Sequence, residues 1–167
     1  MNPRLFISLK KIQMNKSMSV SQLVPEKINI LDFKIIQGEI ESPFEFDISE
    51  VKEHAYSVKF ETSFNIDKKL VKADFKVNVE TVSDNDNALK ANGKFHFVFL
   101  YHIENIKDLI NTDEEDKSAE ISIDGALGNA LASITYSTSR GVLMTRFQGT
   151  SLQSFILPVA NPNDLLE

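Results

Sequence analysis

The stretch that decides the fold is residues 119–141, which read AEISIDGALGNALASITYSTSRG. Apolar side chains recur along it at helical spacing, at Ile123, Leu127, Leu131 and Ile134. An apolar stripe with this period predicts an amphipathic helix, which we expect to begin at residue 118 or 122. Many of the remaining positions hold Gly, Ala or Ser, so this helix can closely approach a sheet or a second copy of itself.

The end of this helix is indicated by Arg140 and Gly141. Glycine adopts the left-handed conformation of a helix C-cap without steric cost. We therefore expect the helix to end at Arg140 and residues 142–157 to form a loop or an extended segment. The run from Asn161 to Asp164 is typical of the start of a second helix.

Four segments between the N-terminal region and this helix carry strand signals. We expect strands over residues 28–41, 56–67, 71–79 and 89–103. Apolar and polar residues alternate most regularly in the second of these, which predicts an antiparallel sheet with one face in contact with water. Turn-forming residues at 67–69 and 83–87 separate the last three strands, so these strands form a meander.

The order of the strands follows from the lengths of their connections. The connection over residues 44–55 is long for a hairpin, so the first and second strands are not expected to be neighbours. We expect the first strand to return beside the fourth, giving the order 1-4-3-2. The fold class is then α+β, a four-stranded antiparallel sheet with a long C-terminal helix on one face. Val98 and Leu100 lie on the otherwise polar face and indicate a second apolar contact there, such as a subunit interface.

The chain of 167 residues suits one domain, and we place that domain over residues 27–167. Residues 1–26 are weakly patterned and are expected to form a weakly ordered N-terminal arm. Within the arm, Leu5, Ile7 and Leu9 could begin a strand, or Leu5, Leu9 and Ile12 a short helix. Thr112 to Lys117 is acidic and reads as a solvated loop.

Composition narrows the class of function. The net charge of −6 argues against nucleic-acid binding, which requires clustered Lys and Arg. There is no cysteine, and no apolar run approaches the ~18 residues of a membrane span, so we expect a cytoplasmic protein without membrane insertion. Phenylalanine is over-represented, with 12 residues. For each of them, filling the core of a sheet is favoured over lining a surface that binds apolar peptide.

No catalytic or metal site is recognisable. His96 and His102 stand six residues apart on one strand, about 20 Å in regular geometry, too far to share a metal. Thr138 to Gly141 lacks the Gly-x-Ser-x-Gly pattern of a nucleophile elbow, and the Gly125 to Gly128 segment lacks the spacing of a dinucleotide fingerprint. We therefore predict a binding protein, not an enzyme, with no metal and no cofactor.

Four short segments, taken in order along the chain, resemble the SecB-like family of export chaperones. They are Ile40-Glu-Ser-Pro43, Asn92-Gly-Lys-Phe95, the helical segment from Ala130 to Ser139-Arg-Gly141, and Leu157-Pro-Val159. The resemblance spans about residues 28–167. It implies an ATP-independent holdase that binds non-native polypeptides in an apolar groove. It also implies a homo-oligomer, a dimer or tetramer.

The resemblance further implies which residues contact a client. Phe44 and Phe46 lie in the connection after the first strand, which contributes to the family's groove. Phe155, Ile156 and Leu157 belong to the segment expected to form the opposite wall. Glu41 matches an acidic position through which the family docks the translocase ATPase.

Several functions remain open at this point. The clients could be unfolded or pre-secretory polypeptides, with a role in protein export. The chain could instead be a dedicated chaperone for an antitoxin, or an oligomeric adaptor for one protein partner. A third hypothesis is a small-molecule-binding domain, which predicts a monomer with a deep closed pocket between helix and sheet.

Overall fold

The computed structural model describes residues 7–9, 23–85, 87–111 and 122–166. Its strands are β1 (Ile7–Leu9), β2 (Ile28–Glu41), β3 (Glu53–Asn65), β4 (Leu70–Val82), β5 (Asn92–Ile103), β6 (Ile110–Asn111) and β7 (Ser122–Ile123). Its helix is α1 (Gly125–Arg146), and its 3-10 turns are η2 (Pro25–Lys27), η3 (Ile48–Glu50), η4 (Ile106–Leu109) and η5 (Pro162–Leu165). The predicted arm over residues 1–26 lies mostly outside the described residues, and so does the predicted acidic loop.

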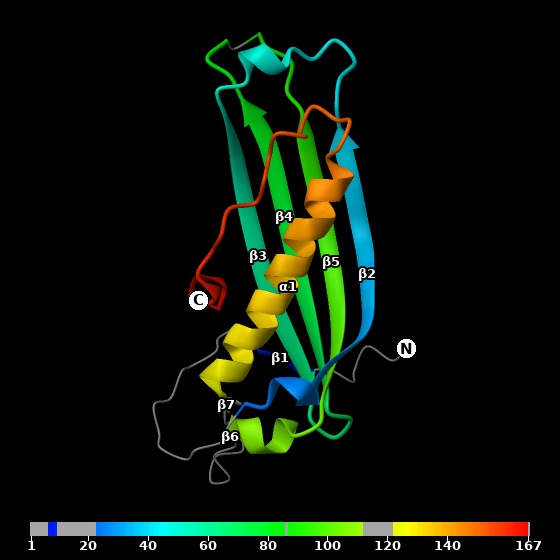
Figure 1. The fold of residues 1–167 in the computed structure, drawn as a ribbon, viewed down its shortest axis with the longest axis vertical. Helices are drawn as coiled ribbons and strands as arrows, with labels where there is room; N and C mark the ends of the chain where they lie inside the picture. The colour runs from blue at the N-terminus through cyan, green and yellow to red at the C-terminus, as the bar shows by residue number, and fades with distance from the viewer. Residues whose placement is uncertain (1–6, 10–22, 86, 112–121, 167) are drawn as a thin grey trace.

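A five-stranded antiparallel sheet forms the body of the molecule, in the order β1-β3-β4-β5-β2. The four long strands therefore have the predicted order 1-4-3-2, and β1 adds a short fifth strand beside β3. Figure 1 shows α1 lying obliquely across one face of this sheet. The fold class predicted from the sequence is confirmed.

The core lies between α1 and the sheet face beneath it. Alternate residues of β4 and β5 are buried on this face, as the period of two predicts. Aromatic rings form a continuous layer, with Phe95 stacked on Phe97 and Phe99 on Tyr101. The buried Tyr101 hydroxyl lies 2.8 Å from Thr135 Oγ1 of α1. Each polar group satisfies the other, because a buried hydroxyl without a partner is costly.

Strand β2 departs from simple alternation in two places. Its pairing with β5 shifts by one residue between Ile30 and Asp32 and again between Ile35 and Gln37. Such bulges insert an unpaired residue and bend the strand. With the two bulges in place, Phe33 pairs with Phe99 and Ile35 pairs with Phe97. The sequence of β2 therefore shows no single period of alternation, although the limits of the strand match the prediction.

The helix extends beyond the predicted end. It continues through Gly141 to Arg146, so the prediction of a C-cap at Gly141 and of a loop directly after it was wrong. The continuation has a tertiary cause, because Leu143 and then Phe147 of the capping turn are buried against the core. The described glycine with positive φ is Gly149, at +74°. After it the chain forms turns and then an extended segment.

The helix also begins later than predicted. Ile123 belongs to β7, which pairs with β6, and Asp124 is the N-cap. The Asp124 carboxylate accepts hydrogen bonds from the backbone N–H groups of Ala126 and Leu127, at 2.9 and 3.4 Å. Such a cap satisfies N–H groups that have no partner within the helix. The start expected at residue 118 or 122 is therefore corrected to Gly125.

Candidate functional site

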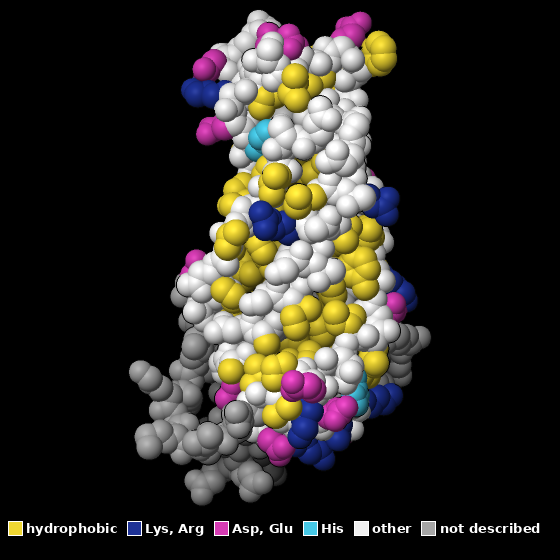
Figure 2. Space-filling view, viewed as in Figure 1, with side chains coloured by type: hydrophobic (Ala, Val, Ile, Leu, Met, Phe, Trp, Pro, Cys, Tyr) yellow, Lys and Arg dark blue, Asp and Glu magenta, His cyan; other side chains and the backbone are white. Residues whose placement is uncertain are grey.

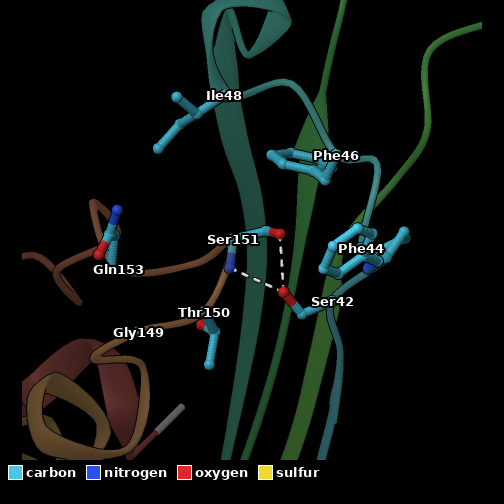
Figure 3. Close-up of a pocket in the computed structure, with 9 residues that line it drawn as sticks. Ser42, Phe44, Phe46, Ile48, Gly149, Thr150, Ser151 and Gln153 are labelled. Atoms are coloured by element: carbon cyan, nitrogen blue, oxygen red, sulfur yellow. Dashed lines mark hydrogen bonds between the residues drawn. The ribbon is translucent and has the colours of Figure 1, made fainter.

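A surface groove of about 460 Å³ lies at one end of the sheet, between the connection that follows β2 and the turn that follows α1. We call it the end groove. It is lined by Ser42, Pro43, Phe44, Phe46, Ile48, Gly149, Thr150, Ser151 and Gln153. Figure 3 shows Phe44, Phe46 and Ile48 on one wall and the turn after α1 on the other.

The second wall is held in place by close packing against Gly93 of β5. A Cβ atom at this position would lie 3.0 Å from Leu152 Cδ1 and 3.1 Å from Phe147 Cε1. Both of these side chains are fully buried. Glycine at position 93 thus allows the end of α1 and its turn to sit directly on the sheet. Gly149 then reverses the chain with a positive φ that glycine adopts easily.

Hydrogen bonds join the two walls at the base of the end groove. Ser42 Oγ lies 2.7 Å from Ser151 Oγ, and it accepts a hydrogen bond from the Ser151 backbone N–H at 2.9 Å. Within the turn, the Thr150 hydroxyl donates to the Phe147 carbonyl at 2.8 Å. These contacts give the turn a defined position opposite the connection after β2.

The first wall is shaped by a local turn at Asp47. Its carboxylate accepts hydrogen bonds from the Ser49 hydroxyl at 2.7 Å and from the Ser49 N–H at 2.8 Å. These two bonds, the side-chain bond first, lower the pKa of Asp47. Lys52 pairs with Asp84 at 2.7 Å and so ties this wall to the turn between β4 and β5. The wall is therefore anchored at its far end.

Phe44 differs from every other phenylalanine whose side chain the structure describes. Its relative exposure is 103%, whereas the others are buried or packed partly buried against the core. Burial of a phenylalanine side chain contributes about 1.5–3 kcal/mol, and Phe44 makes no such contribution within the described chain. Its ring lies at the rim of the end groove, beside the partly buried Phe46.

The predicted site residues fall into two groups. Phe44 and Phe46 line the end groove, but Phe155, Ile156 and Leu157 are not among its lining residues. Phe155 and Leu157 are buried, at 6% and 1% exposure, whereas Ile156 is half exposed. The groove wall opposite Phe44 is instead the polar turn after α1, which sequence reasoning missed. Its only local signal is a short run of turn-forming residues.

Two predicted residues have a clear structural role. The Phe155 ring contacts the rings of His54, Tyr56 and Phe147, with centroids 5.5, 5.8 and 6.0 Å away. It therefore fixes the segment after α1 to β3. Glu41, at the end of β2, accepts a hydrogen bond from the Asn92 amide and remains exposed.

The chemistry of the end groove is that of a binding surface. Its lining residues carry aromatic rings, aliphatic groups, hydroxyls and an amide, but no titratable side chain. Within the part of the chain that the structure describes, no group of three or more His, Cys, Asp or Glu could hold a metal ion. In the same residues, no helix is long and apolar enough to cross a membrane. Such a lining suits apolar side chains together with backbone hydrogen-bonding groups.

This sheet with one long helix has the fold of SecB-like chaperones. One similar solved structure is that of the SecB-like chaperone Rv1957 of Mycobacterium tuberculosis, determined in complex with a ChAD peptide from the Rv1956 HigA1 antitoxin. The TM-score is 0.51 at 12% sequence identity, and the match covers 81% of this chain and 91% of that one. No protein-family model and no curated protein sequence matches the chain. The likeness is thus one of fold.

Proposed function

We propose that this protein is a SecB-like chaperone, an ATP-independent holdase that binds non-native polypeptide in the end groove. The observation that carries the proposal is the fully exposed Phe44 ring at the rim of that groove. An exposed aromatic ring beside a groove that contains other apolar residues is a typical anchor for an apolar side chain of a partner. Phe46 and Ile48 extend the apolar wall, and the opposite turn offers hydroxyls and an amide.

The distribution of side chains on the surface supports this proposal. Figure 2 shows apolar side chains along much of the face that carries α1, with charged side chains gathered mostly toward its two ends. A client held by apolar contacts requires no nucleotide and no catalytic group. We therefore propose a protein that is not an enzyme and uses no cofactor. From the family resemblance we further propose that it works in the cytoplasm as a dimer or tetramer. The partly buried Val98 and Leu100 on the outer sheet face would contribute to its subunit contacts.

The choice of client separates two forms of the proposal. A general holdase would receive unfolded or pre-secretory polypeptides and could pass them to the translocase ATPase, with Glu41 on the docking surface. A dedicated chaperone would serve one protein partner. The structural neighbour's complex with an antitoxin peptide makes this second form a specific candidate for the present chain.

Light scattering from a denatured model protein, diluted into buffer without ATP, tests the proposal. We expect near-stoichiometric amounts of the chain to suppress aggregation. Phe44→Ser should weaken binding of an apolar peptide by about 10- to 100-fold, the value of one buried phenylalanine. Leu89→Ser is the matched control, because Leu89 is also an exposed apolar residue but does not line the groove.

Three results distinguish the alternatives. Suppression of aggregation that is lost with Phe44→Ser but kept with Leu89→Ser supports the general holdase. Tight binding of a single partner through Phe44, without any effect on aggregation, supports the dedicated form. Equal behaviour of the two variants in both assays would remove the end groove from the proposal. A strict monomer by multi-angle light scattering would contradict the predicted oligomer.

A further inference from the structure

A second and smaller pocket lies between α1 and the last segment of the chain. Its volume is about 140 Å³, and we call it the arginine pocket. It is lined by Ser133, Tyr136, Ser137, Arg140, Val159, Ala160, Pro162 and Leu165. The segment after α1 thus contributes to both sites, with its first turn at the end groove and its last residues here. None of the lining residues is shared with the end groove.

Arg140 gives this pocket its chemical character. Its Nε atom is shielded from solvent and has no hydrogen-bond partner in the described structure. The ion pairs among the described residues are formed by lysines and one histidine, and none involves Arg140. In Figure 2, Lys or Arg colour in the middle of this face is bordered by apolar and neutral side chains. The guanidinium is therefore a partly buried cation that forms no ion pair with the residues that the structure describes.

Two other polar side chains of the pocket are already engaged. The Tyr136 hydroxyl donates to the Pro158 carbonyl at 2.6 Å, and the Ser137 hydroxyl donates to the Ser133 carbonyl at 2.7 Å. Burial raises the pKa of Tyr136, whereas the charge of Arg140 acts in the opposite direction. The guanidinium thus lies within electrostatic reach of the pocket wall, and no ion pair with a described residue engages it.

The unpaired Arg140 Nε has an energetic cost. A buried donor without a partner costs about 1–3 kcal/mol, and more when it is charged. Groups that cost stability are found at functional sites. A planar carboxylate can accept two parallel hydrogen bonds from the terminal nitrogens of a guanidinium, so its binding does not need the shielded Nε. The rest of the wall includes the apolar Val159, Ala160, Pro162 and Leu165. The small volume limits the ligand to one small residue.

We propose that the arginine pocket binds the C-terminal carboxylate of a polypeptide, with Arg140 as its ionic partner. The apolar residues Val159, Pro162 and Leu165 would surround a small terminal side chain. This inference rests on the proposed function and deepens it, because it names a group by which a held polypeptide is anchored. A phosphate group is disfavoured, since one guanidinium meets only part of its charge and its acceptors.

Fluorescence anisotropy with three labelled apolar peptides tests this assignment. The peptides share one sequence, and they end in a free carboxylate, in an amide, or in an amide preceded by Asp. We expect the free acid to bind at least about tenfold more tightly than the amide, the value of one charge-assisted hydrogen bond. Arg140→Gln should abolish this difference and leave affinity for the amide unchanged. If only the peptide with the Asp side chain binds more tightly than the plain amide, the pocket recognises a side-chain carboxylate, and the assignment to the chain terminus is refuted.

Control variants separate this inference from a structural role and from the proposed function. Arg146→Gln, in the last turn of the same helix, should preserve the preference for the acid. Phe44→Ser should weaken the acid and the amide equally. The melting temperature of Arg140→Gln should stay equal or rise, whereas a structural arginine would lower it. If the free acid and the amide bind with equal affinity, the carboxylate site in the arginine pocket is refuted while the proposed holdase function stands. If no peptide binds at all, both the carboxylate site and the proposed function are refuted.

Discussion

The substitution Gly141→Ala tests the extended helix directly. Gly141 lies within α1, and a Cβ atom there would meet no other atom within 4 Å. Alanine is therefore sterically free at this position and adds no buried contact. What changes is helix propensity, which favours alanine over glycine by about 1 kcal/mol. For a chain of this size we expect the melting temperature to rise by about 2–4 °C.

Gly149→Ala provides the matched comparison. A Cβ atom at Gly149 would also meet nothing within 4 Å, but φ there is +74°. An L-residue in this region costs about 1–2 kcal/mol, so the melting temperature should fall by an amount similar to the rise at Gly141. The two glycines differ in backbone conformation and not in available space. The opposite signs therefore report on conformation alone.

Circular dichroism at 222 nm, with thermal and urea unfolding at one fixed protein concentration, measures both variants. The fixed concentration matters because an oligomer unfolds at a temperature that depends on concentration. If Gly141 were the C-cap suggested by the Ser-Arg-Gly sequence, Gly141→Ala would destabilise the protein and Gly149→Ala would have little effect. That result would refute the helix limits described above.

Four further predictions concern the core and His54 beside it. Gly93→Ala should destabilise the protein by about 1–3 kcal/mol through overpacking, and urea unfolding that matches the parent would contradict the close approach at this position. Tyr101→Phe should cost about 1–3 kcal/mol in urea unfolding because it leaves the buried Thr135 hydroxyl unpaired, and adding Thr135→Val should restore part of the loss. Burial raises the pKa of Tyr101 to about 12, so absorbance at 295 nm should show no phenolate from this residue at pH 10. Burial also lowers the pKa of His54, so its neutral form is favoured in the folded state. The resulting stability is present above pH 6.5 and is lost as the pH falls toward the lower folded pKa, and melting curves of His54→Gln should show a weaker decline over that range.

Strands β4 and β5 could be predicted because each face of these strands has one environment. In β4 and β5 every second residue contacts the core, so period two survives in the sequence. The strand order followed from connection lengths alone. The helix end could not be predicted in this way. Gly141 is a local stop signal, but burial of Leu143 and Phe147 by the sheet outweighs it.

The end groove was only half predictable. The family resemblance predicted Phe44 and Phe46 in a client groove, and both line the end groove, whereas their contact with a client stays a prediction. The turn that forms the opposite wall was not predicted. Ser42 and Ser151 meet across 109 residues of sequence, and a serine in a turn carries no signal of its distant partner. The resemblance pointed to residues 155–157, yet the longer helix places the turn at Gly149 to Gln153 opposite Phe44.

The two bulges of β2 have a consequence for aggregation. β2 forms one edge of the sheet, and an uninterrupted free edge is a template on which other chains can grow. The shifts after Ile30 and Ile35 divide this edge into three short regular runs. An incoming strand would therefore lose its hydrogen-bonding match every few residues. The bulges of β2 thus protect this edge of the sheet against nucleating fibrils.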